Sequence, residues 1–533
     1  MSLAMKSGRR DLVLGISVGL LCLATRLPWA SRMLYNSDST RLALAVEHFD
    51  VSQMRPHAPG YILYVALGKL ADLVIHDPGT SLVAVSILST ALAAVVLYFL
   101  GLRMFSRSTG FVSAMLLWSS PLVWFNGEMA FTYTLETFLS LAFAYACFRA
   151  LSGDRWGLPA SALFLGLATG ARQNMILFLF PLWIFVLRKY GFKRILGSIC
   201  IFAFTSLAWL IPLVVLSGGW KTYFGVLRAQ VATVVVPAVS FLTQIQIRGR
   251  FLASFLLYSL VLGLGPLLYF FGRSIRGGTA FRDARYTFLG LWILPAALFF
   301  IGVNLYNPGQ VMVILPPLFL LAAEGINRFT EVIGGNARKV GARAAALPGR
   351  GRRIQRAVFV ASVIVLLAVN IFVFLFLETP VSAASIKEGE RRLSELVRLT
   401  REHFAPENVL ILACRLNTQA GYYLPEYRII CPFPLIFSGD EIPIRSQNVY
   451  VSFGRQTEPK TYWMDTGFKI EPLSFPDGVE TLILWEEEVA GYYENRERPL
   501  REIASSAGGA KIYALQVKPG EKIHYSYHFL SIR

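Results

Sequence analysis

Charged residues are scarce in this sequence. They make up 16% of the 533 residues, whereas 55% are hydrophobic and the mean hydropathy is +0.52. A water-soluble chain of this length needs far more polar surface to cover itself. The composition therefore excludes an ordinary soluble protein and predicts an integral membrane protein with many spans.

Several signatures of bound groups are also missing. The sequence has no GxGxxG after a strand, no Walker loop and no obvious DxD domain, so no nucleotide site is predicted. Its pI near 9.8 would suit nucleic acid, but the basic residues lie beside apolar runs and not along one soluble face. No nucleic-acid partner is therefore expected. No tight His/Asp/Glu ligand spacing appears, so the sequence neither requires nor excludes a divalent metal, and no other cofactor is expected.

Apolar runs dominate the first 377 residues, and most are long enough to cross ~30 Å of hydrocarbon. A bundle of about eleven transmembrane helices is expected, in an all-α membrane domain over 1–377. The predicted spans are 12–28, 80–102, 108–124, 131–150, 157–171, 173–187, 195–217, 251–272, 286–303, 310–325 and 357–377.

The remaining residues, 378–533, predict a small soluble α/β domain. A helical pattern at 384–403 precedes ENVLILACR, a short helix near NTQAGYYLPE, and YRIICPFP; VYVSFG, TLILWEEE and KIYALQVK read as further strands. The domain either shapes the entrance to a site in the membrane domain or only stabilises the protein. Cys414 and Cys431 form either a disulfide or a pair of buried thiols on neighbouring strands.

The distribution of charge predicts the topology. Residues 378–533 carry a net charge of −3, which leaves +21 on residues 1–377, and the loop 326–356 holds eight basic residues against Glu331 alone. Basic loops mark the cytoplasmic side. We therefore expect a cytoplasmic N-terminus and an extracytoplasmic C-terminal domain. No Asn-x-Ser/Thr sequon occurs, which favours a bacterial plasma (inner) membrane.

The outer loop at 29–79 carries most of the polar groups that could form a site. Residues 42–49 have apolar side chains at helical spacing, and Tyr61–Ile75 is interrupted by charges, so both segments predict helices at the membrane interface. Asp38 is either an N-cap or a functional carboxylate. His57, which neighbouring prolines hold in place, is either structural or part of a site.

This loop resembles the C-type glycosyltransferase superfamily, in particular protein O-mannosyltransferases and aminoarabinose transferases. The residues that carry the resemblance are Asp38-Ser39 and the run His57-Ala58-Pro59-Gly60-Tyr61-Ile62-Leu63-Tyr64, close to a DS…HPPGYPLY pattern. Ala58 replaces a proline of that pattern, and Ser39 stands where O-mannosyltransferases have a glutamate. The resemblance implies a substrate role for His57 and Tyr61.

Three further segments resemble the same relatives. FNGEMAFTYTLETF places Glu128 and Tyr133 as substrate-binding candidates, although Glu128 would also suit a helix start. GLATGARQN brings Arg172 to the outer end of a short span, where the resemblance implies binding of a donor phosphate and snorkelling to the interface is the alternative. In NLYNPGQVMVILPPL, Tyr306 and Gln310 are either cavity contacts or parts of a plain turn.

The resemblance implies a glycosyltransferase whose donor sugar is linked to a polyprenyl phosphate in the bilayer. The acceptor is a glycan, lipid or protein hydroxyl on the outer face, Asp38 is the expected base, and direct displacement implies inversion. The main alternative is a transporter or flippase, because the Gly-interrupted segment 157–187 resembles a discontinuous helix. A non-catalytic assembly or receptor protein is a further alternative.

Overall fold

The computed structural model describes residues 8–235, 241–276, 283–343, 350–432, 447–453, 460–464 and 473–532, the last with short gaps at 476, 492, 494–497, 506–508, 519 and 527–528. The chain forms two compact units. The first contains residues 1–30, 59–215 and 229–386, and the second contains 31–58, 216–228 and 387–533. The functional domain boundary expected at 377/378 stays a prediction.

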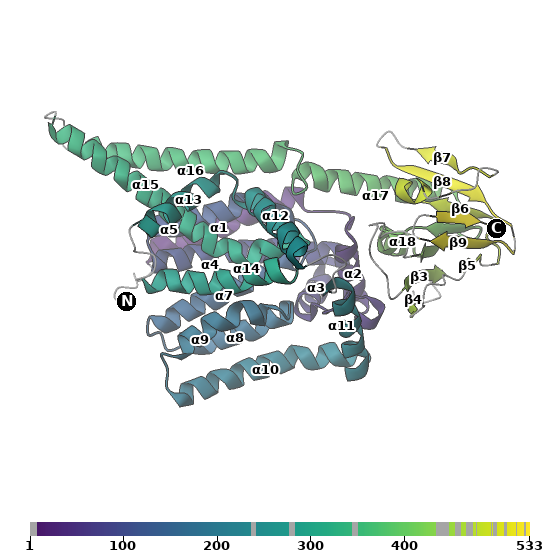
Figure 1. The fold of residues 1–533 in the computed structure, drawn as a ribbon, viewed down its shortest axis with the longest axis horizontal. Helices are drawn as coiled ribbons and strands as arrows, with labels where there is room; N and C mark the ends of the chain where they lie inside the picture. Colours follow the sequence, from purple (N-terminus) through teal and green to yellow (C-terminus); the bar gives the residue numbers. More distant parts are fainter. Residues whose placement is uncertain are drawn as a thin grey trace. The chain divides into compact units, whose positions relative to one another are not determined.

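The first unit is helical throughout (Figure 1). Helix α4 packs against α1, α3, α5 and α7, and α7 packs against α8, while α15 packs against α5, α13 and α16. Its helices are α1 (Arg9–Arg26), α3 (Ile62–Ile75), α4 (Pro78–Met104), α5 (Arg107–Ser119), α6 (Pro121–Gly127), α7 (Tyr133–Leu151), α8 (Gly157–Ala171), α9 (Met175–Leu187), α10 (Phe192–Leu216), α12 (Phe241–Leu260), α13 (Leu264–Arg276), α14 (Ala284–Gly302), α15 (Leu315–Arg343) and α16 (Arg350–Phe376), with 3-10 turns at η1 (Leu27–Trp29), η3 (Val261–Gly263) and η4 (Pro308–Ile314).

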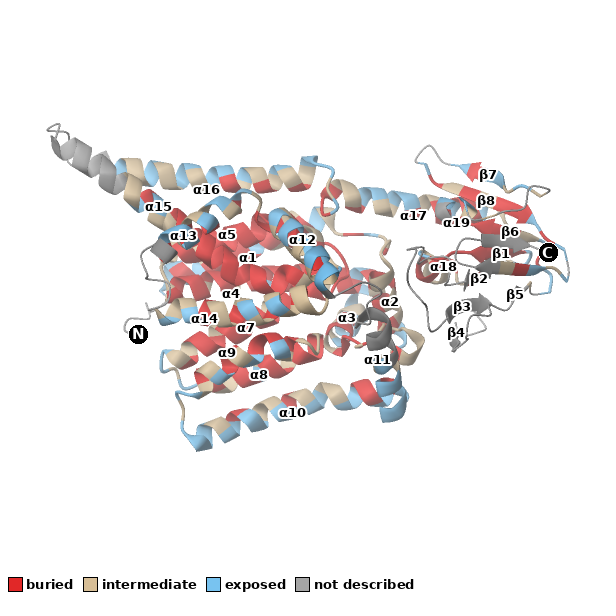
Figure 2. Cartoon of the chain, in the orientation of Figure 1, coloured by how far each residue is buried: buried red, intermediate tan, exposed pale blue. Residues whose placement is uncertain are grey.

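The prediction of a polytopic helical fold is confirmed. Among the described residues, eight helical stretches are long and apolar enough to cross a membrane, and α8 and α9 are shorter apolar helices. All eleven predicted spans fall on helices. How many of the shorter helices cross the bilayer stays a prediction. Figure 2 shows buried residues along most of α4 and α7, whereas α10 and α16 expose much of their surface, as expected of helices that face lipid.

Two predicted spans are interrupted in the structure. The span expected at 108–124 breaks into α5 and α6 because Pro121 has no N–H to continue the helix, and Ser120 before it is extended at ψ 123°. The span expected at 251–272 begins too late and is interrupted near its middle. Helix α12 begins ten residues earlier, at Phe241, and η3 separates it from α13 next to Gly263, where glycine lowers helix propensity.

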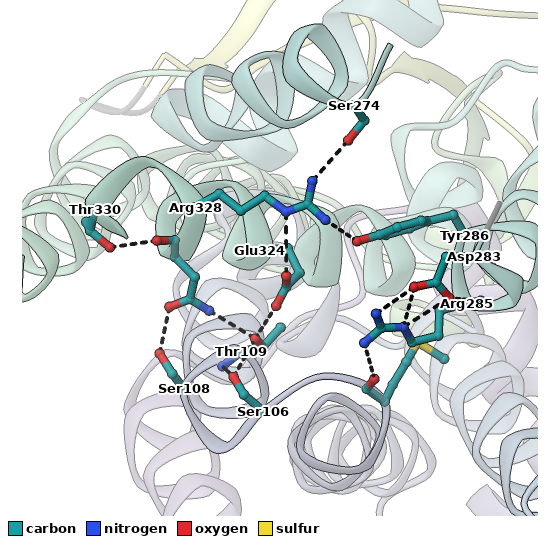
Figure 3. A network of polar contacts seen from close by, with 12 residues as sticks. Ser106, Ser108, Thr109, Ser274, Asp283, Arg285, Tyr286, Glu324, Arg328 and Thr330 are labelled. Atoms are coloured by element: carbon teal, nitrogen blue, oxygen red, sulfur yellow. Dashed lines mark hydrogen bonds and ion pairs between the residues drawn. The ribbon is translucent and has the colours of Figure 1, made fainter. Parts of the chain in front are cut away.

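Polar side chains join several helices at the end of the unit that the basic loops assign to the cytoplasm (Figure 3). Arg107 at the start of α5 pairs with Asp11 in the first turn of α1, at 2.6 Å. Thr109 of α5 donates to Glu324 of α15, and Arg285 at the start of α14 donates to the Met104 carbonyl at the end of α4. The predicted cytoplasmic ends of these helices thus lie together.

The second unit contains the predicted α/β domain. Strand β1 is central and pairs in parallel with β2 and β6, in a seven-stranded mixed sheet of order β4-β3-β2-β1-β6-β8-β7, and a second sheet has the order β10-β9-β5. The strands are β1 (Val409–Leu412), β2 (Arg428–Pro432), β3 (Gln447–Phe453), β4 (Lys460–Met464), β5 (Leu473–Ser474), β6 (Thr481–Leu484), β7 (Arg501–Ser505), β8 (Lys511–Gln516), β9 (Lys522–Ser526) and β10 (Phe529–Ile532).

Helices cover this sheet, and strand side chains alternate between two cores. Leu410 and Leu412 point into one core, and Val409 and Ile411 point into the other, which also contains Leu393 of α17. Successive side chains of a strand point to opposite faces of the sheet, so β1 contributes to both cores. The side chain of Cys431 lies outside the described residues, so its pairing with Cys414 stays open. The helices that lie wholly in this unit are α2 (Ser37–Glu47), α18 (Asn417–Tyr423), α19 (Glu487–Gly491) and the 3-10 turn η2 (Val51–Gln53), and α11 (Trp220–Val235) and α17 (Ala383–His403) lie mostly in it.

Candidate functional site

Arg172 lies at the break between two short helices of the membrane unit. Helix α8 ends at Ala171, and Arg172 has extended backbone angles (φ −156°, ψ 123°) before α9 begins at Met175. Its guanidinium lies 5.5 Å from the centroid of the Tyr61 ring and 5.0 Å from that of Tyr133. The structure therefore brings together three candidates that lie far apart in the sequence.

Glu136 completes this group, which we call the Arg172 cage (Arg172, Glu136, Tyr61 and Tyr133). Its Oε2 lies 3.2 Å from Arg172 Nη1, and its Oε1 accepts a 2.6 Å hydrogen bond from the Thr132 hydroxyl. The sequence predicts a partner for a carboxylate at this depth, and Arg172 is that partner. The Arg172 side chain is 13% exposed, which contradicts the alternative of a cation snorkelling to the interface.

The turn at 306–310 lies against the cage. A Cβ on Gly309 would come 2.1 Å from Cδ2 of the Tyr133 ring, so only glycine allows this approach. Gln310 Oε1 accepts the amides of Tyr306 and Asn307 and thereby caps η4. The structural interpretation of Gln310 accounts for that side chain, whereas Tyr306 is 58% exposed and available for contacts.

Arg248 is a further candidate for the site that was not predicted from the sequence. This arginine of α12 is 4% exposed, donates to the Gly302 carbonyl at 3.0 Å and to Gln244 Oε1 at 2.7 Å, and lies 6.0 Å from the Tyr306 ring centroid. Both acceptors are neutral, and among the described residues no carboxylate pairs with it. IQIRGR lies just before the span predicted at 251–272, so the sequence does not predict that this arginine is buried, although a buried charge in a helix of a membrane protein marks function.

Asp38 and His57 lie together in the second unit. Asp38 Oδ1 is 3.6 Å from His57 Nδ1, and the two side chains are 38% and 15% exposed. Asn36, not Ser37 or Asp38, is the N-cap of α2, since its side chain accepts the Asp38 amide at 2.9 Å. The capping alternative for Asp38 is therefore wrong, because the Asn36 side chain, and not the Asp38 carboxylate, caps α2.

Glu128 is fully buried in the membrane unit, away from any helix start. It follows the end of α6, and the Trp124 indole donates to it. The guanidinium of buried Arg26 lies 5.0 Å from the centroid of the same Trp124 ring, and Phe374 stacks on that ring at 4.8 Å. The helix-start interpretation is contradicted, because α7 begins only at Tyr133. A substrate contact for Glu128 stays a prediction.

Metal ligands are not gathered anywhere in the described part of the chain. No group of three or more His, Cys, Asp or Glu side chains is placed to hold a metal ion there.

The fold is that of C-type membrane glycosyltransferases, which confirms the predicted resemblance. A family model described as dolichyl-phosphate-mannose-protein mannosyltransferase matches residues 57–220, the part that contains the Arg172 cage. A comparison with curated protein sequences gives no match.

Two crystal structures of ArnT from Cupriavidus metallidurans are similar to the chain over nearly its whole length. The apo structure has a TM-score of 0.57 at 13% identity, covering 94% of this chain and 97% of ArnT. The structure bound to undecaprenyl phosphate has a TM-score of 0.57 at 12% identity, covering 95% and 98%.

Proposed function

We propose that this protein transfers a sugar from a polyprenyl phosphate to an acceptor hydroxyl on the outer face of a plasma membrane. The fold supports the proposal, because one similar structure is bound to undecaprenyl phosphate and the matching family is named for a dolichyl-phosphate sugar. The observation that carries it is the Arg172 cage, a guanidinium held between two tyrosine rings inside a membrane protein.

The charges of the membrane unit suit a phosphate diester. Arg172 and Glu136 form a neutral pair, whereas Arg248 contacts only neutral acceptors among the described residues. The two arginines flank the turn at 306–310. Arg172 lies over the Tyr133 ring, and that ring contacts Gly309 of the turn. Arg248 lies over the ring of Tyr306, at the start of the turn. Both can donate several N–H groups to phosphate oxygens. The net positive charge then balances the single negative charge of a sugar phosphate diester.

In the proposed reaction, Asp38 removes the proton from the acceptor hydroxyl. That oxygen attacks the anomeric carbon, the bond from this carbon to the phosphate oxygen breaks, and polyprenyl phosphate leaves with the electron pair. One direct displacement inverts the anomeric centre. His57, 3.6 Å from Asp38, orients the carboxylate, and the arginines stabilise the charge that develops on the leaving phosphate.

The test uses purified protein, a panel of polyprenyl phosphate sugars and the substitution Asp38→Asn. Wild-type protein should release free polyprenyl phosphate from one donor, and Asp38→Asn should lower that rate at least a hundredfold, in the range of general-base catalysis. Asp77→Asn is the matched control, because Asp77 caps α4 and asparagine caps equally well. Transfer at wild-type rate by Asp38→Asn would remove Asp38 as the base.

The same assay separates the enzyme from a transporter. A flippase moves the intact lipid-linked sugar across the bilayer, and no free polyprenyl phosphate appears. The break between α8 and α9 is the feature that favours this alternative, because transporters bind substrates at such breaks. Movement of intact donor in vesicles without release of polyprenyl phosphate would support it.

A further inference from the structure

The segment that precedes α2 contacts α17 of the C-terminal domain through one carboxylate. Glu390 Oε1 of α17 accepts the Ser31 hydroxyl at 2.8 Å, the Arg32 amide at 2.5 Å and the Met33 amide at 3.2 Å. Hydrogen bonds to an ionised acceptor are stronger than neutral ones. Three donors on consecutive residues therefore fix the path of the backbone at 31–33.

Helix α18 holds the next two residues of the same segment. The Leu34 amide donates to the Tyr423 hydroxyl at 2.7 Å, and the buried Gln419 side chain donates to the Tyr35 carbonyl at 2.9 Å. The Met33 and Tyr35 side chains pack on the domain's hydrophobic core. Residues 31–35 thus belong to the C-terminal domain by contact, although 357 to 389 residues separate the bonded partners in the sequence.

Gly389 makes this arrangement sensitive to a single methyl group. A Cβ at this position of α17 would lie 2.5 Å from Cδ2 and 2.7 Å from Cε2 of the Tyr35 ring. Rings are rigid, and two neighbouring hydrogen bonds hold the Tyr35 backbone, so the clash would be relieved by moving the segment.

The anchored segment leads directly into the turn that carries Asp38. Asn36 caps α2 and accepts the Asp38 amide, and the Thr40 hydroxyl donates to the Leu34 carbonyl at 2.9 Å. The first turn of α2 is therefore tied to residue 34, which α18 holds. A displacement of residues 31–35 would be passed to the Asp38 carboxylate and to its distance from His57.

We propose that the C-terminal domain positions the catalytic carboxylate, with Glu390, Gly389, Gln419 and Tyr423 as positioning residues. The inference rests on the proposed role of Asp38 as the base. None of the four residues needs to touch donor or acceptor. The domain then has a task in catalysis beyond shaping an entrance or stabilising the fold, because a displacement of about 1 Å at a reacting group costs roughly a hundredfold in rate.

The test measures kcat, the KM for acceptor and the Kd for polyprenyl phosphate of the full chain in detergent. Glu390→Gln keeps a neutral acceptor and Glu390→Ala removes it, so kcat should fall in the order Glu, Gln, Ala, with the alanine variant at least tenfold down. The Kd for polyprenyl phosphate should stay within twofold, because the Arg172 cage lies in the other unit. Glu402→Gln is the matched control, since Glu402 lies on α17 in an exposed pair with Arg398.

Two milder variants keep the test decisive if Glu390→Ala fails to fold. Gly389→Ala favours the helical conformation of α17 yet displaces Tyr35, and Tyr423→Phe removes only the hydroxyl that binds the Leu34 amide. Both should lower kcat several-fold with unchanged Kd. Full kcat in Gly389→Ala and Tyr423→Phe, in a protein that Asp38→Asn inactivates, would overturn the positioning role. Full activity in Asp38→Asn would instead overturn the proposed function.

Discussion

A guanidinium at the end of a short apolar helix could simply reach for the membrane surface, but Arg172 turns inward to a carboxylate. Its partner Glu136 is 5% exposed, so removal of Arg172 alone leaves a buried negative charge. Such unpaired charges cost about 3–5 kcal/mol. A loss of activity in Arg172→Ala would therefore mix weakened donor binding with weakened folding.

A conservative substitution of Arg172 separates these effects. Arg172→Lys keeps the charge for Glu136 and loses the planar fork, so the thermal transition should survive while affinity for polyprenyl phosphate falls about tenfold to a hundredfold, the equivalent of ~1.5–3 kcal/mol. Arg172→Ala combined with Glu136→Gln should fold and bind more weakly still. Equal affinity in wild type and both variants would leave the cage with a structural role only.

Arg248 offers a second test at the scale of one residue. It is buried on α12, whereas Arg250, two residues later, is exposed. Arg248→Gln should lower the affinity for polyprenyl phosphate about tenfold through the loss of one charge-assisted contact. Arg250→Gln removes the same charge from the same helix and should have no effect. Equal losses in the two variants would point to a general effect of charge on the bilayer surface and against a phosphate ligand.

At the scale of single elements, the end of β6 carries a buried carboxylate. Glu486 accepts the Cys414 amide at 2.7 Å and the Leu416 amide at 2.8 Å, both in the loop after the neighbouring parallel strand β1. Burial raises the pKa of Glu486 above its usual 4.5, against the lowering effect of these hydrogen bonds. Glu486 therefore binds its proton more tightly in the folded domain than in the unfolded chain.

The raised pKa gives a pH dependence of known sign. The contribution of Glu486 to stability is fully present below pH 4.5 and is lost as pH rises through its folded pKa. Relative to Glu486→Gln, whose amide does not titrate, protection of the Cys414 and Leu416 amides from hydrogen exchange should therefore decrease from acidic to neutral pH. A protection ratio that stays constant or rises over this range would contradict the assigned burial.

The sequence predicts the elements better than it predicts which of them meet. Long apolar runs located the helices and short strand-like runs located the central strands, because burial in lipid or in a core requires apolar side chains. The pairing of Glu136 with Arg172 was not predicted, since charge at depth indicates that a partner exists but not which residue it is. The anchoring of residues 31–35 on α17 and α18 had no sequence signal at all, because backbone amides bind Glu390 and Gln419 in a way that residue types do not reveal.

At the scale of the whole molecule, the basic loops predict an orientation that a reporter can test. A fusion after Glu378 should be active only outside the cytoplasm, and a fusion within the loop 326–356 should be active only inside, because α16 between them is long and apolar enough to cross the membrane. The two fusions should give opposite results with each reporter. Signals from the same side would show that α16 does not cross and would reverse the placement of the C-terminal domain.

The contacts of residues 31–35 with α17 and α18 also determine the order in which parts of the protein can fold during synthesis. Residues 31–58 leave the ribosome early, yet their partners Glu390, Gln419 and Tyr423 are made only after α16. During synthesis, residues 31–35 therefore lack those hydrogen bonds until the intervening helices have been made. Assembly of the Asp38 region is accordingly a late event, and a chain that stops translation before α17 would contain the carboxylate but lack the surface that orients it.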